Sequence, residues 1–398
     1  MNDSVVIVGA SLAGLRAAGT LRERGFAGPL VIVGEESEVP YDRPPLSKEL
    51  LAGSVQETDI ALRIPADLEA EWLLGRRATG LDLDRRVVSI DSGTQIPFGG
   101  LVIATGVRPR MLPGWTADGT TVFTLRTLSD AFALRTALER RPRLLIVGAG
   151  FIGVEVATTA RGLGCEVTMV TADPPVAVAG REISEVCDRL LAELGVRRVV
   201  GVPITGREGG SVVLGDGSRV EFDAVLVAIG SVPNVEWLAG SGLTLDDGVL
   251  CDASCAAVGA DRVVAAGDVA RWPNPVFDYT PMRIEHWSNA IEQGTAAART
   301  LLEGSNPETE CASVPAFWSN HGGARLQSVG LPGMADRVEL VAGDPAEARF
   351  AVAAYRGDEL VGALAYGMPK ALIPYRVTLG KRGQNPAAKA VPGAGATG

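Results

Sequence analysis

Two copies of one strand–turn–helix phosphate-binding pattern lie about 140 residues apart in this chain of 398 residues. They read VVIVGASLAG at residues 5–14 and LLIVGAGFIG at residues 144–153. In each copy a short apolar run predicts a buried parallel strand, and the glycines permit a tight turn and close approach of the backbone to a pyrophosphate. The following helix then directs its N-terminal amides and its dipole at that phosphate. Two copies predict two dinucleotides bound together, an arrangement suited to hydride transfer from a nicotinamide to a flavin.

Each glycine pattern opens a longer unit that occurs twice. In the first unit, an apolar strand at residues 30–33 ends at Gly34-Glu35-Glu36, where an acid accepts a hydrogen bond from a ribose hydroxyl. The second unit continues with a strand, a helix and a hairpin at residues 166–170, 184–194 and 216–217. Apolar strands that end in ATG at 104–106 and AIG at 228–230 complete the two units. This matched pair indicates an internal duplication.

The composition excludes several classes of function. A net charge of −10 argues against nucleic acid binding, because phosphates need a basic footprint, and an acidic protein partner would need a local arginine-rich patch. No apolar run reaches the roughly 18 residues of a membrane span, and the N-terminal apolar stretch is needed as the first strand. We therefore expect no membrane association. Five cysteines in this length favour a reducing compartment, and we expect a cytoplasmic protein.

Eight further segments carry a more specific resemblance. They are PYDRPPLSK at 40–48, IATGVRPR at 103–110, LRTLSDA at 125–131, GAGFIGVEVA at 148–157, AIGSVPN at 228–234, AAGDVA at 265–270, RIEHWSNAIEQG at 283–294 and PAFWSN at 315–320. In these segments the chain resembles the FAD-dependent ferredoxin reductases that serve bacterial oxygenases, of the putidaredoxin-reductase-like type. These belong to the pyridine nucleotide:flavin oxidoreductases with two dinucleotide domains. The resemblance covers roughly the first 330 residues, and the last 65 or so match poorly.

The resemblance implies an α/β fold of two Rossmann-like, glutathione-reductase-like domains and a small C-terminal α+β domain. The expected FAD-binding domain combines residues 1–110 with 240–312, and the NAD(P)H-binding domain covers 111–239. The texture changes near Ser313, so residues 313–380 are assigned to the C-terminal domain. Residues 381–398, rich in Gly, Ala, Pro and Lys, are predicted to be a disordered tail.

The resemblance also implies an NAD(P)H:ferredoxin oxidoreductase. Hydride passes from the nicotinamide to flavin N5, and two single electrons then leave for an iron–sulfur ferredoxin. That ferredoxin supplies a haem-thiolate monooxygenase or a ring-hydroxylating oxygenase. No cysteine precedes Cys165, so the flavin module lacks the CxxxxC disulfide of glutathione reductase and the single cysteine of NADH peroxidases. An enzyme without redox cysteines needs an external acceptor.

The first glycine pattern is expected to hold FAD. Gly9, Ser11 and Gly14 are assigned to the pyrophosphate, with Ser11 small enough to replace the middle glycine. Glu35 is the expected ribose acceptor, whereas Glu36 is interpreted as a solvated loop acid. By resemblance alone, the FAD contacts extend to Ala13, Arg43, Lys48, Ala78, Thr105, Gly106, Arg126, Glu285 and Trp287.

A second FAD anchor is expected at Gly267-Asp268. The glycine admits the ribityl chain, and the carboxylate accepts hydrogen bonds from its hydroxyls. The helix after Trp287 is expected to aim its positive end at the flavin pyrimidine. Trp287 and Trp318 are either core residues or aromatics at the flavin edge.

The second glycine pattern is expected to hold the nicotinamide dinucleotide through Gly148, Gly150, Ile152, Gly153 and Gly230. The strand after it ends at Thr171, where an NAD enzyme usually has Asp or Glu, and no arginine replaces it to meet a 2′-phosphate. Asp173 and Arg181 lie nearby and favour opposite cofactors. The cofactor is NADH or NADPH, with NADH favoured by a small margin.

Lys48 and Glu155 are the expected catalytic residues. The resemblance places Lys48 against the flavin, where a cation near N5 stabilises the electron-rich reduced ring, and Glu155 is expected to pair with it. The alternative for Glu155 is an ordinary acid in the first turn of a helix. Only His286 and His321 are present, so no metal site is expected.

Two other functions remain open at the level of sequence. A redox-sensing flavoprotein of the apoptosis-inducing-factor type shares the same flavin core. It would bind NADH, form a long-lived charge-transfer complex and change its assembly state. A reductase of quinones or other small molecules would be active without any ferredoxin.

Overall fold

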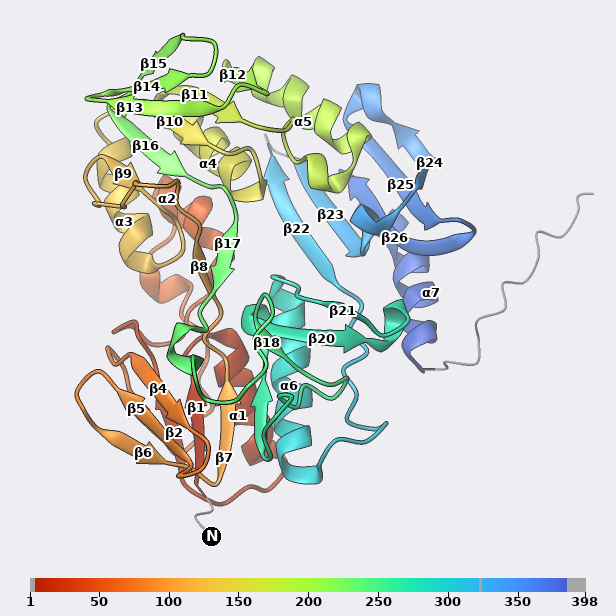
Figure 1. The fold of residues 1–398 in the computed structure, drawn as a ribbon. Coiled ribbons are helices and arrows are strands. Elements are labelled where there is room, and N and C mark those ends of the chain that lie inside the picture. The colour runs from red at the N-terminus through yellow and green to blue at the C-terminus, as the bar shows by residue number, and fades with distance from the viewer. Residues whose placement is uncertain (1–3, 322–323, 385–398) are drawn as a thin grey trace, which may run out of the picture.

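The computed structural model describes residues 4–321 and 324–384, which form three packed units (Figure 1). Two α/β units lie one below the other, and the C-terminal unit, drawn in blue, lies beside the upper one. Each α/β unit contains a five-stranded parallel sheet, and the C-terminal unit contains a five-stranded antiparallel sheet with a helix. The predicted α/β architecture with a small C-terminal α+β domain is confirmed.

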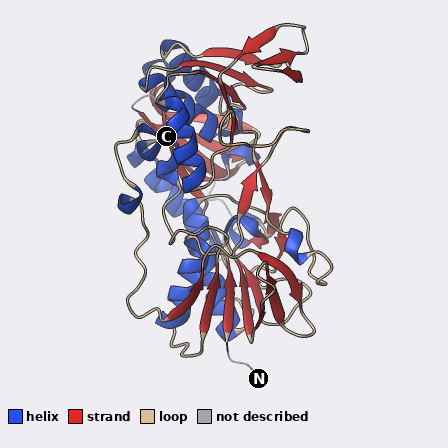
Figure 2. Ribbon diagram, turned by 90° about the vertical axis from the view of Figure 1, so that its left-hand side faces the viewer, coloured by secondary structure: helices blue, strands red, loops and turns tan. Residues whose placement is uncertain are grey.

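The first unit is built on a parallel sheet in the order β19-β7-β1-β2-β3. Its central strands are short apolar runs that are almost fully buried, as expected for a parallel sheet covered on both faces. Helices α1 and α6 pack against each other on one face of this sheet (Figure 2). The elements are β1 (Val5–Val8), α1 (Leu12–Glu23), β2 (Leu30–Val33), β3 (Ala70–Leu73), β7 (Gly100–Ile103), β19 (Val263–Ala265) and α6 (Trp287–Glu303), with an antiparallel sheet of β4 (Ala78–Asp82), β5 (Val87–Ile90) and β6 (Gln95–Pro97).

The second unit repeats this plan with a sheet in the order β12-β11-β10-β16-β9. In both units the strand before the glycine turn is central and lies between the next strand and the strand that ends in ATG or AIG. The elements are β9 (Val122–Phe123), α3 (Leu128–Leu138), β10 (Arg143–Val147), α4 (Phe151–Gly162), β11 (Glu166–Thr171), α5 (Arg181–Glu193), β12 (Arg197–Val200) and β16 (Ala224–Val227), with an antiparallel sheet of β13 (Ile204–Glu208), β14 (Ser211–Leu214) and β15 (Arg219–Glu221).

Two short strands connect the α/β units. Strand β8 (Val107–Pro109) leaves the first unit, β17 (Ser231–Pro233) returns to it, and the two pair in antiparallel fashion. Beside them, the hydroxyl of Thr105 donates to the carbonyl of Asn234 at 2.8 Å, and the Asn234 amide donates back to the Thr105 carbonyl at 2.9 Å. The crossing point of the chain is therefore fixed by backbone and side-chain hydrogen bonds together.

The segment 41–60 lies within the predicted FAD-binding range but packs with the second unit. Its buried apolar side chains share one core cluster with α3 and α4; they are Tyr41, Leu46, Leu50, Leu51 and Ile60. The segment includes a 3₁₀ turn at Pro44–Ser47 and the short helix α2 (Glu49–Ala52). This packing brings the end of the Pro-Pro loop against the second dinucleotide-binding unit.

The remaining strands and the C-terminal unit follow the second crossing. Strands β18 (Val249–Leu250), β20 (Ala270–Asn274) and β21 (Thr280–Met282) form a small sheet in the first unit. The C-terminal sheet has the order β22-β23-β26-β25-β24. Its elements are β22 (Ala316–His321), β23 (Ala324–Gly330), β24 (Arg337–Asp344), β25 (Arg349–Arg356), β26 (Glu359–Tyr366) and α7 (Ile373–Gln384).

The prediction of a disordered tail at residues 381–398 is wrong for residues 381–384. Residues 381–384 belong to α7, because Leu379 is fully buried and Arg382 donates to the Glu359 carboxylate at 2.6 Å and to the Leu360 carbonyl at 2.8 Å. The rest of that prediction, residues 385–398, lies outside the described residues. Within the described ranges, no helix combines the length and the apolar character that a bilayer crossing requires.

Candidate functional site

Backbone atoms pack so closely around the first glycine turn that Gly9 and Gly14 have no room for a side chain. A Cβ atom at Gly9 would lie 2.0 Å from the carbonyl oxygen of Ala104, and a Cβ atom at Gly14 would lie 1.9 Å from the carbonyl oxygen of Gly9. Gly9 also has a φ of +124°, which side-chain-bearing residues rarely adopt. Both positions therefore require glycine so that β1, the turn and α1 can approach.

The second glycine turn repeats these contacts and explains the role of its middle glycine. Gly148 and Gly153 face backbone carbonyls at 2.2 Å and 2.4 Å from an ideal Cβ, whereas a Cβ at Gly150 would meet no atom within 4 Å. Gly150 has an extended backbone with φ −70°, and Ser11, at the same place in the first turn, is also extended. The middle position is open on the side where a pyrophosphate is expected, and a serine there needs no backbone change.

Three helices begin without an acid or a side-chain cap. Helices α1, α4 and α6 have no acidic residue in the first turn and no side-chain hydrogen bond at the N-cap. In contrast, α3 is capped by Thr127 and Asp130. Free N-terminal amides and the positive end of the helix dipole suit an anionic ligand, so α1 and α4 fit dinucleotide phosphates and α6 fits an electron-rich ring.

Arg43 connects the first glycine turn with the loop that carries the acids. Its guanidinium donates to Glu36 at 2.5 Å, to the Tyr41 hydroxyl at 2.8 Å and to the carbonyl of Arg126 at 2.6 Å, and it lies 3.5 Å from the Ser11 hydroxyl. The interpretation of Glu36 as a solvated loop acid is therefore wrong, because this ion pair and the Tyr41 hydroxyl hold its carboxylate. Burial raises the pKa of Tyr41, so this phenol stays protonated.

Glu35, the expected ribose acceptor, is exposed just after β2. Its neighbour Glu36 is turned inward by the contacts with Arg43 and Tyr41. The two adjacent acids therefore take different roles, Glu36 in the internal network and Glu35 on the surface beside the first glycine turn.

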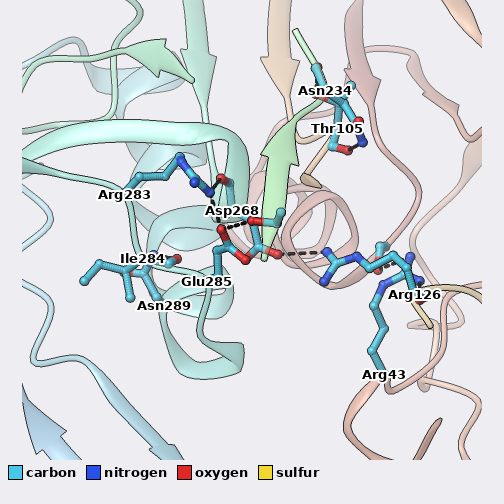
Figure 3. Close-up of polar contacts among 12 residues, drawn as sticks. Arg43, Thr105, Arg126, Asn234, Asp268, Arg283, Ile284, Glu285 and Asn289 are labelled. Carbon is cyan, nitrogen blue, oxygen red and sulfur yellow. Dashed lines mark hydrogen bonds and ion pairs between the residues drawn. The ribbon is translucent and has the colours of Figure 1, made fainter. Parts of the chain in front are cut away.

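Asp268 lies at the centre of a second charged group (Figure 3). Its carboxylate accepts from Arg126 at 2.8 Å, and its backbone carbonyl accepts from Arg283 at 3.1 Å. Arg283 also pairs with Glu285 at 2.6 Å. The predicted anchor thus brings together residues from both α/β units, since Arg126 precedes α3.

Gly267 is required by the close packing of α1, and its predicted contact with the ribityl chain stays a prediction. Its φ is +78°, and an added Cβ would lie 2.9 Å from the Cβ of Ala13 in α1. The Gly267 amide donates to the side-chain oxygen of Gln293 in α6 at 2.8 Å. Gln293 is fully buried, and its side-chain nitrogen has no hydrogen-bond partner in the described part of the chain. This orphaned donor beside Gly267 fits a polar group of a bound cofactor.

Lys48 and Glu155 form a buried ion pair. The Lys48 ammonium lies 2.7 Å from the Glu155 carboxylate, and their side chains are 12% and 6% exposed. Glu155 lies in the second turn of α4, so the alternative of an ordinary first-turn acid is wrong. The pair joins the end of the Pro-Pro loop to the helix that follows the second glycine turn.

The start of α6 is surrounded by aromatic rings. Trp287 donates from its indole nitrogen to Asp42 at 2.8 Å and meets Trp318 edge-on with ring centroids 6.1 Å apart. Trp287 is 37% exposed, so it is not a core residue. His286 precedes it, and burial lowers the pKa of its imidazole to about 4, which keeps the ring neutral beside the helix N-terminus.

The end of β11 presents no charge to a nicotinamide ribose. Thr171 is almost buried, and its hydroxyl donates to the carbonyl of Asp173 at 2.9 Å within the following loop. Arg181 is exposed and pairs with Glu185 at 2.9 Å along α5. Neither a carboxylate nor an arginine is therefore fixed at the strand end.

The other predicted contacts lie around the same two turns. Gly106 and Gly230 follow β7 and β16 at the crossing between the units, and Ile152 is exposed in the first turn of α4. Ala78 is buried at the start of β4. Glu285 accepts from the Ser231 hydroxyl and from Arg283, which places it beside the return strand β17.

Sequence reasoning missed several members of these networks. Tyr41 and Ser47 lie within the PYDRPPLSK segment and Ser319 within PAFWSN, so the segments were identified but their mutual contacts were not. No spacing rule along the chain indicates that Ser47 and Ser319 both donate to Glu155. All five cysteines are buried and none forms a disulfide, and burial raises the pKa of the Cys165, Cys187 and Cys251 thiols.

Comparison with known families agrees with this arrangement. A family described as pyridine nucleotide-disulphide oxidoreductase matches residues 3–294, and a family described as reductase C-terminal matches residues 316–394. The chain belongs to the pyridine nucleotide-disulphide oxidoreductase family. The second match also corrects the expectation that the last 65 or so residues match poorly, because the C-terminal reductase domain extends through them.

Curated relatives and solved structures are similar over nearly the whole chain. The chain is 38% identical to the ferredoxin–NAD(+) reductase component of the anthranilate 1,2-dioxygenase system of Burkholderia cepacia, over 91% of this chain and 90% of that protein. It is 34% identical to putidaredoxin reductase of Pseudomonas putida, over 92% and 89% of the two chains. The reductase in a covalent putidaredoxin reductase–putidaredoxin complex superposes with a TM-score of 0.89, at 33% identity and over 96% and 94% of the chains.

Proposed function

We propose that this chain is an FAD-dependent NADH:ferredoxin reductase that supplies electrons to an oxygenase system. The observation that carries the proposal is the buried Lys48–Glu155 pair, which links the Pro-Pro loop of the proposed FAD-binding range to the helix after the second glycine turn. Dinucleotides on the two glycine turns meet between these units. The names of the relatives, which are ferredoxin–NAD(+) reductase components of oxygenase systems and putidaredoxin reductase, support NADH as donor and a ferredoxin as acceptor.

The proposed FAD site is in the first unit, with boundaries 1–110 and 240–312. Its pyrophosphate lies on the first glycine turn, where the Arg43 guanidinium near Ser11 supplies positive charge. Asp268, oriented by Arg126, accepts from the ribityl hydroxyls. The other proposed contacts are Gly9, Ala13, Gly14, Glu35, Lys48, Ala78, Thr105, Gly106, Glu285 and Trp287.

The proposed NADH site is in the second unit, residues 111–239. The proposed C-terminal domain covers residues 313–380. Gly148, Gly150 and Gly153 form the phosphate turn, with Ile152 and Gly230 at its edges. The two bound cofactors supply the hydride and one-electron chemistry. The protein would align them, and Lys48, held by Glu155, would supply a fixed cation to the flavin ring.

The electron acceptor is proposed to be an iron–sulfur ferredoxin. The described residues include every cysteine, and all are buried and outside any disulfide, so no redox disulfide is available to take electrons from the flavin. A one-electron carrier meets that need. The free thiols also support the cytoplasmic location that the cysteine content predicts.

Ferredoxin-dependent reduction of cytochrome c by NADH tests the proposal. With putidaredoxin as the probe ferredoxin, we expect cytochrome c reduction to accelerate strongly over the rate with NADH and reductase alone. Rapid reduction of quinones with no effect of ferredoxin would favour a small-molecule reductase instead. Slow flavin reduction with persistent long-wavelength absorbance would favour an NADH-sensing flavoprotein.

A further inference from the structure

The Glu155 carboxylate is held at both oxygens. One oxygen, Oε2, accepts from the Lys48 ammonium at 2.7 Å and from the Ser47 hydroxyl at 2.5 Å. The other, Oε1, accepts from the Ser319 hydroxyl at 2.5 Å. Because the side chain is 6% exposed, these protein donors take the place of water. Hydrogen bonds to both oxygens fix the rotation of the carboxylate plane.

Ser319 reaches this point from the C-terminal domain. Side chains alternate along a strand, so Phe317 and Ser319 share one face of β22. On that face the Phe317 ring packs against Phe151 of α4, with centroids 4.6 Å apart, and against His286, with centroids 5.0 Å apart. These rings set the position of β22 against α4, and Ser319 is 1% exposed beside them.

The two oxygens depend on different parts of the molecule. Both donors to Oε2 come from the Pro-Pro loop, whereas the donor to Oε1 comes from β22. Without the Ser319 hydroxyl, Oε1 loses this buried donor and the carboxylate can turn away from the geometry in which it holds Lys48. A small misplacement of a group that positions reacting rings can slow a reaction by about 10- to 100-fold.

We propose that Ser319 is a positioning residue for hydride transfer, through which the C-terminal domain orients Glu155 and hence Lys48. The inference rests on the proposed function, since it assumes that the Lys48–Glu155 pair lies where nicotinamide and flavin meet. It assigns to the C-terminal domain a part in the reaction between the two cofactors, exerted through Glu155 and Lys48.

The test uses Ser319→Ala in the holoenzyme, with Ser328→Ala as the matched control. Ser328 is a serine on the neighbouring strand β23, 1% exposed, and its hydroxyl has no hydrogen-bond partner within the described ranges. Anaerobic stopped-flow gives the limiting rate of flavin reduction and the Kd for NADH separately. The long-wavelength charge-transfer absorbance of the reduced enzyme with NAD⁺ reports ring alignment independently of rate. FAD content and Tm verify folding.

Ser319→Ala is expected to lower the limiting rate about 10- to 100-fold and to weaken the charge-transfer absorbance, with little change in the Kd for NADH. Ser328→Ala is expected to match the parent enzyme. Glu155→Gln should be slow as well, and adding Ser319→Ala to it should cause little further loss, because Ser319 acts through Glu155. If Ser319→Ala loses FAD, Ser319→Cys, with a weaker donor of similar size, should show an intermediate rate.

The outcomes separate this inference from the proposed function. If Ser319→Ala and Ser319→Cys behave like Ser328→Ala while Glu155→Gln is slow, the role of Ser319 is overturned and the proposed function stands. If Glu155→Gln also reduces its flavin at the parent rate, the assignment of the Lys48–Glu155 pair fails and the inference falls with it. Additive losses in the double variant would also overturn it, since they would show that Ser319 acts independently of Glu155.

Discussion

Asp268 is the single residue on which FAD retention is expected to depend most. Its carboxylate pairs with Arg126 at 2.8 Å, and the side chain is only 14% exposed. Asp268→Ala removes the proposed acceptor for the ribityl chain and leaves Arg126 without this partner. A lost hydrogen bond to a charged group costs about 2 kcal/mol, or about 30-fold in affinity.

The FAD content of the purified variant, read from the ratio of flavin to protein absorbance, measures this loss. Asp246→Ala is the control, because Asp246 forms an exposed pair with Arg271 in the same unit. A fully yellow and active Asp268→Ala protein would contradict the assigned role.

His286 predicts a specific pH dependence of stability. Burial lowers the pKa of its imidazole from 6.5 to about 4, so between these values the unfolded chain binds a proton that the folded chain excludes. Stability therefore falls as the pH decreases through this window. Between pH 7.5 and 5 we expect the parent protein to lose about 2 kcal/mol more than His286→Phe.

For a chain of this size the difference corresponds to about 2–3 °C in Tm, which thermal unfolding of the holoproteins at the two pH values can resolve. The comparison of pH effects within each protein cancels any constant cost of the substitution. Equal losses in the two proteins would mean that His286 is protonated in the folded state.

Single residues were predictable from sequence where local sterics decide their identity. Gly9 and Gly14 face backbone carbonyls of their own unit, and the pattern of the strand, turn and helix is enough to place them. The adjacent acids Glu35 and Glu36 could not be told apart, because their roles depend on Arg43, which the fold brings to one of them. Ser319 was out of reach, since its partner is 164 positions away.

At the scale of an element, the second glycine turn is expected to tolerate a side chain at its middle glycine, Gly150, and not at its last, Gly153. Gly150→Ser is expected to change Tm by less than about 1 °C and NADH affinity by less than about tenfold, because the site is open and Ser11 occupies the same place in the first turn. Gly153→Ala places a Cβ 2.4 Å from the Gly148 carbonyl oxygen and should cost about 2 kcal/mol.

Thermal unfolding and NADH titration of the two variants side by side measure these effects. The substitutions are only three positions apart and each adds a small side chain, so they control for one another. A larger loss of stability in Gly150→Ser than in Gly153→Ala would contradict this account of the turn.

The end of strand β11 predicts a change in cofactor preference. Thr171 presents no charge to the ribose, so Thr171→Glu is expected to raise the ratio of kcat/KM for NADH over NADPH by about tenfold, through repulsion of the 2′-phosphate. Parallel assays with the two nucleotides measure the ratio. Thr205→Glu makes the same charge change at an exposed position in β13 and should leave the ratio unaltered. An unchanged ratio in Thr171→Glu would mean that the ribose is read elsewhere.

Elements were predicted well in their order and less well at their ends. The helix expected near 184–194 begins at Arg181, and residues 381–384, expected in a disordered tail, continue α7 to Gln384. The extension of α7 depends on packing that the local pattern does not contain, such as the contact of Arg382 with β26. The repeated sheet order was foreseeable because the ATG and AIG strands are marked in the sequence.

At the scale of the whole molecule, the sequence gives the three units but not how they share one site. The segment 41–60 belongs by position to the first unit and packs in the core of the second. Arg126 reaches from the second unit to Asp268, and Ser319 reaches from the third to Glu155. The last two contacts join residues 142 and 164 positions apart, and only the folded chain brings them together.

The proposed function requires that both dinucleotides bind at once and that electrons leave the flavin singly for a ferredoxin. Anaerobic stopped-flow with the yellow holoprotein tests this most directly, with one equivalent of NADH added first and oxidised putidaredoxin second. The account predicts rapid and complete bleaching of the flavin absorbance by NADH, followed by its return as two equivalents of the ferredoxin are reduced. Slow or partial bleaching, or a reduced flavin that the ferredoxin does not reoxidise, would contradict it.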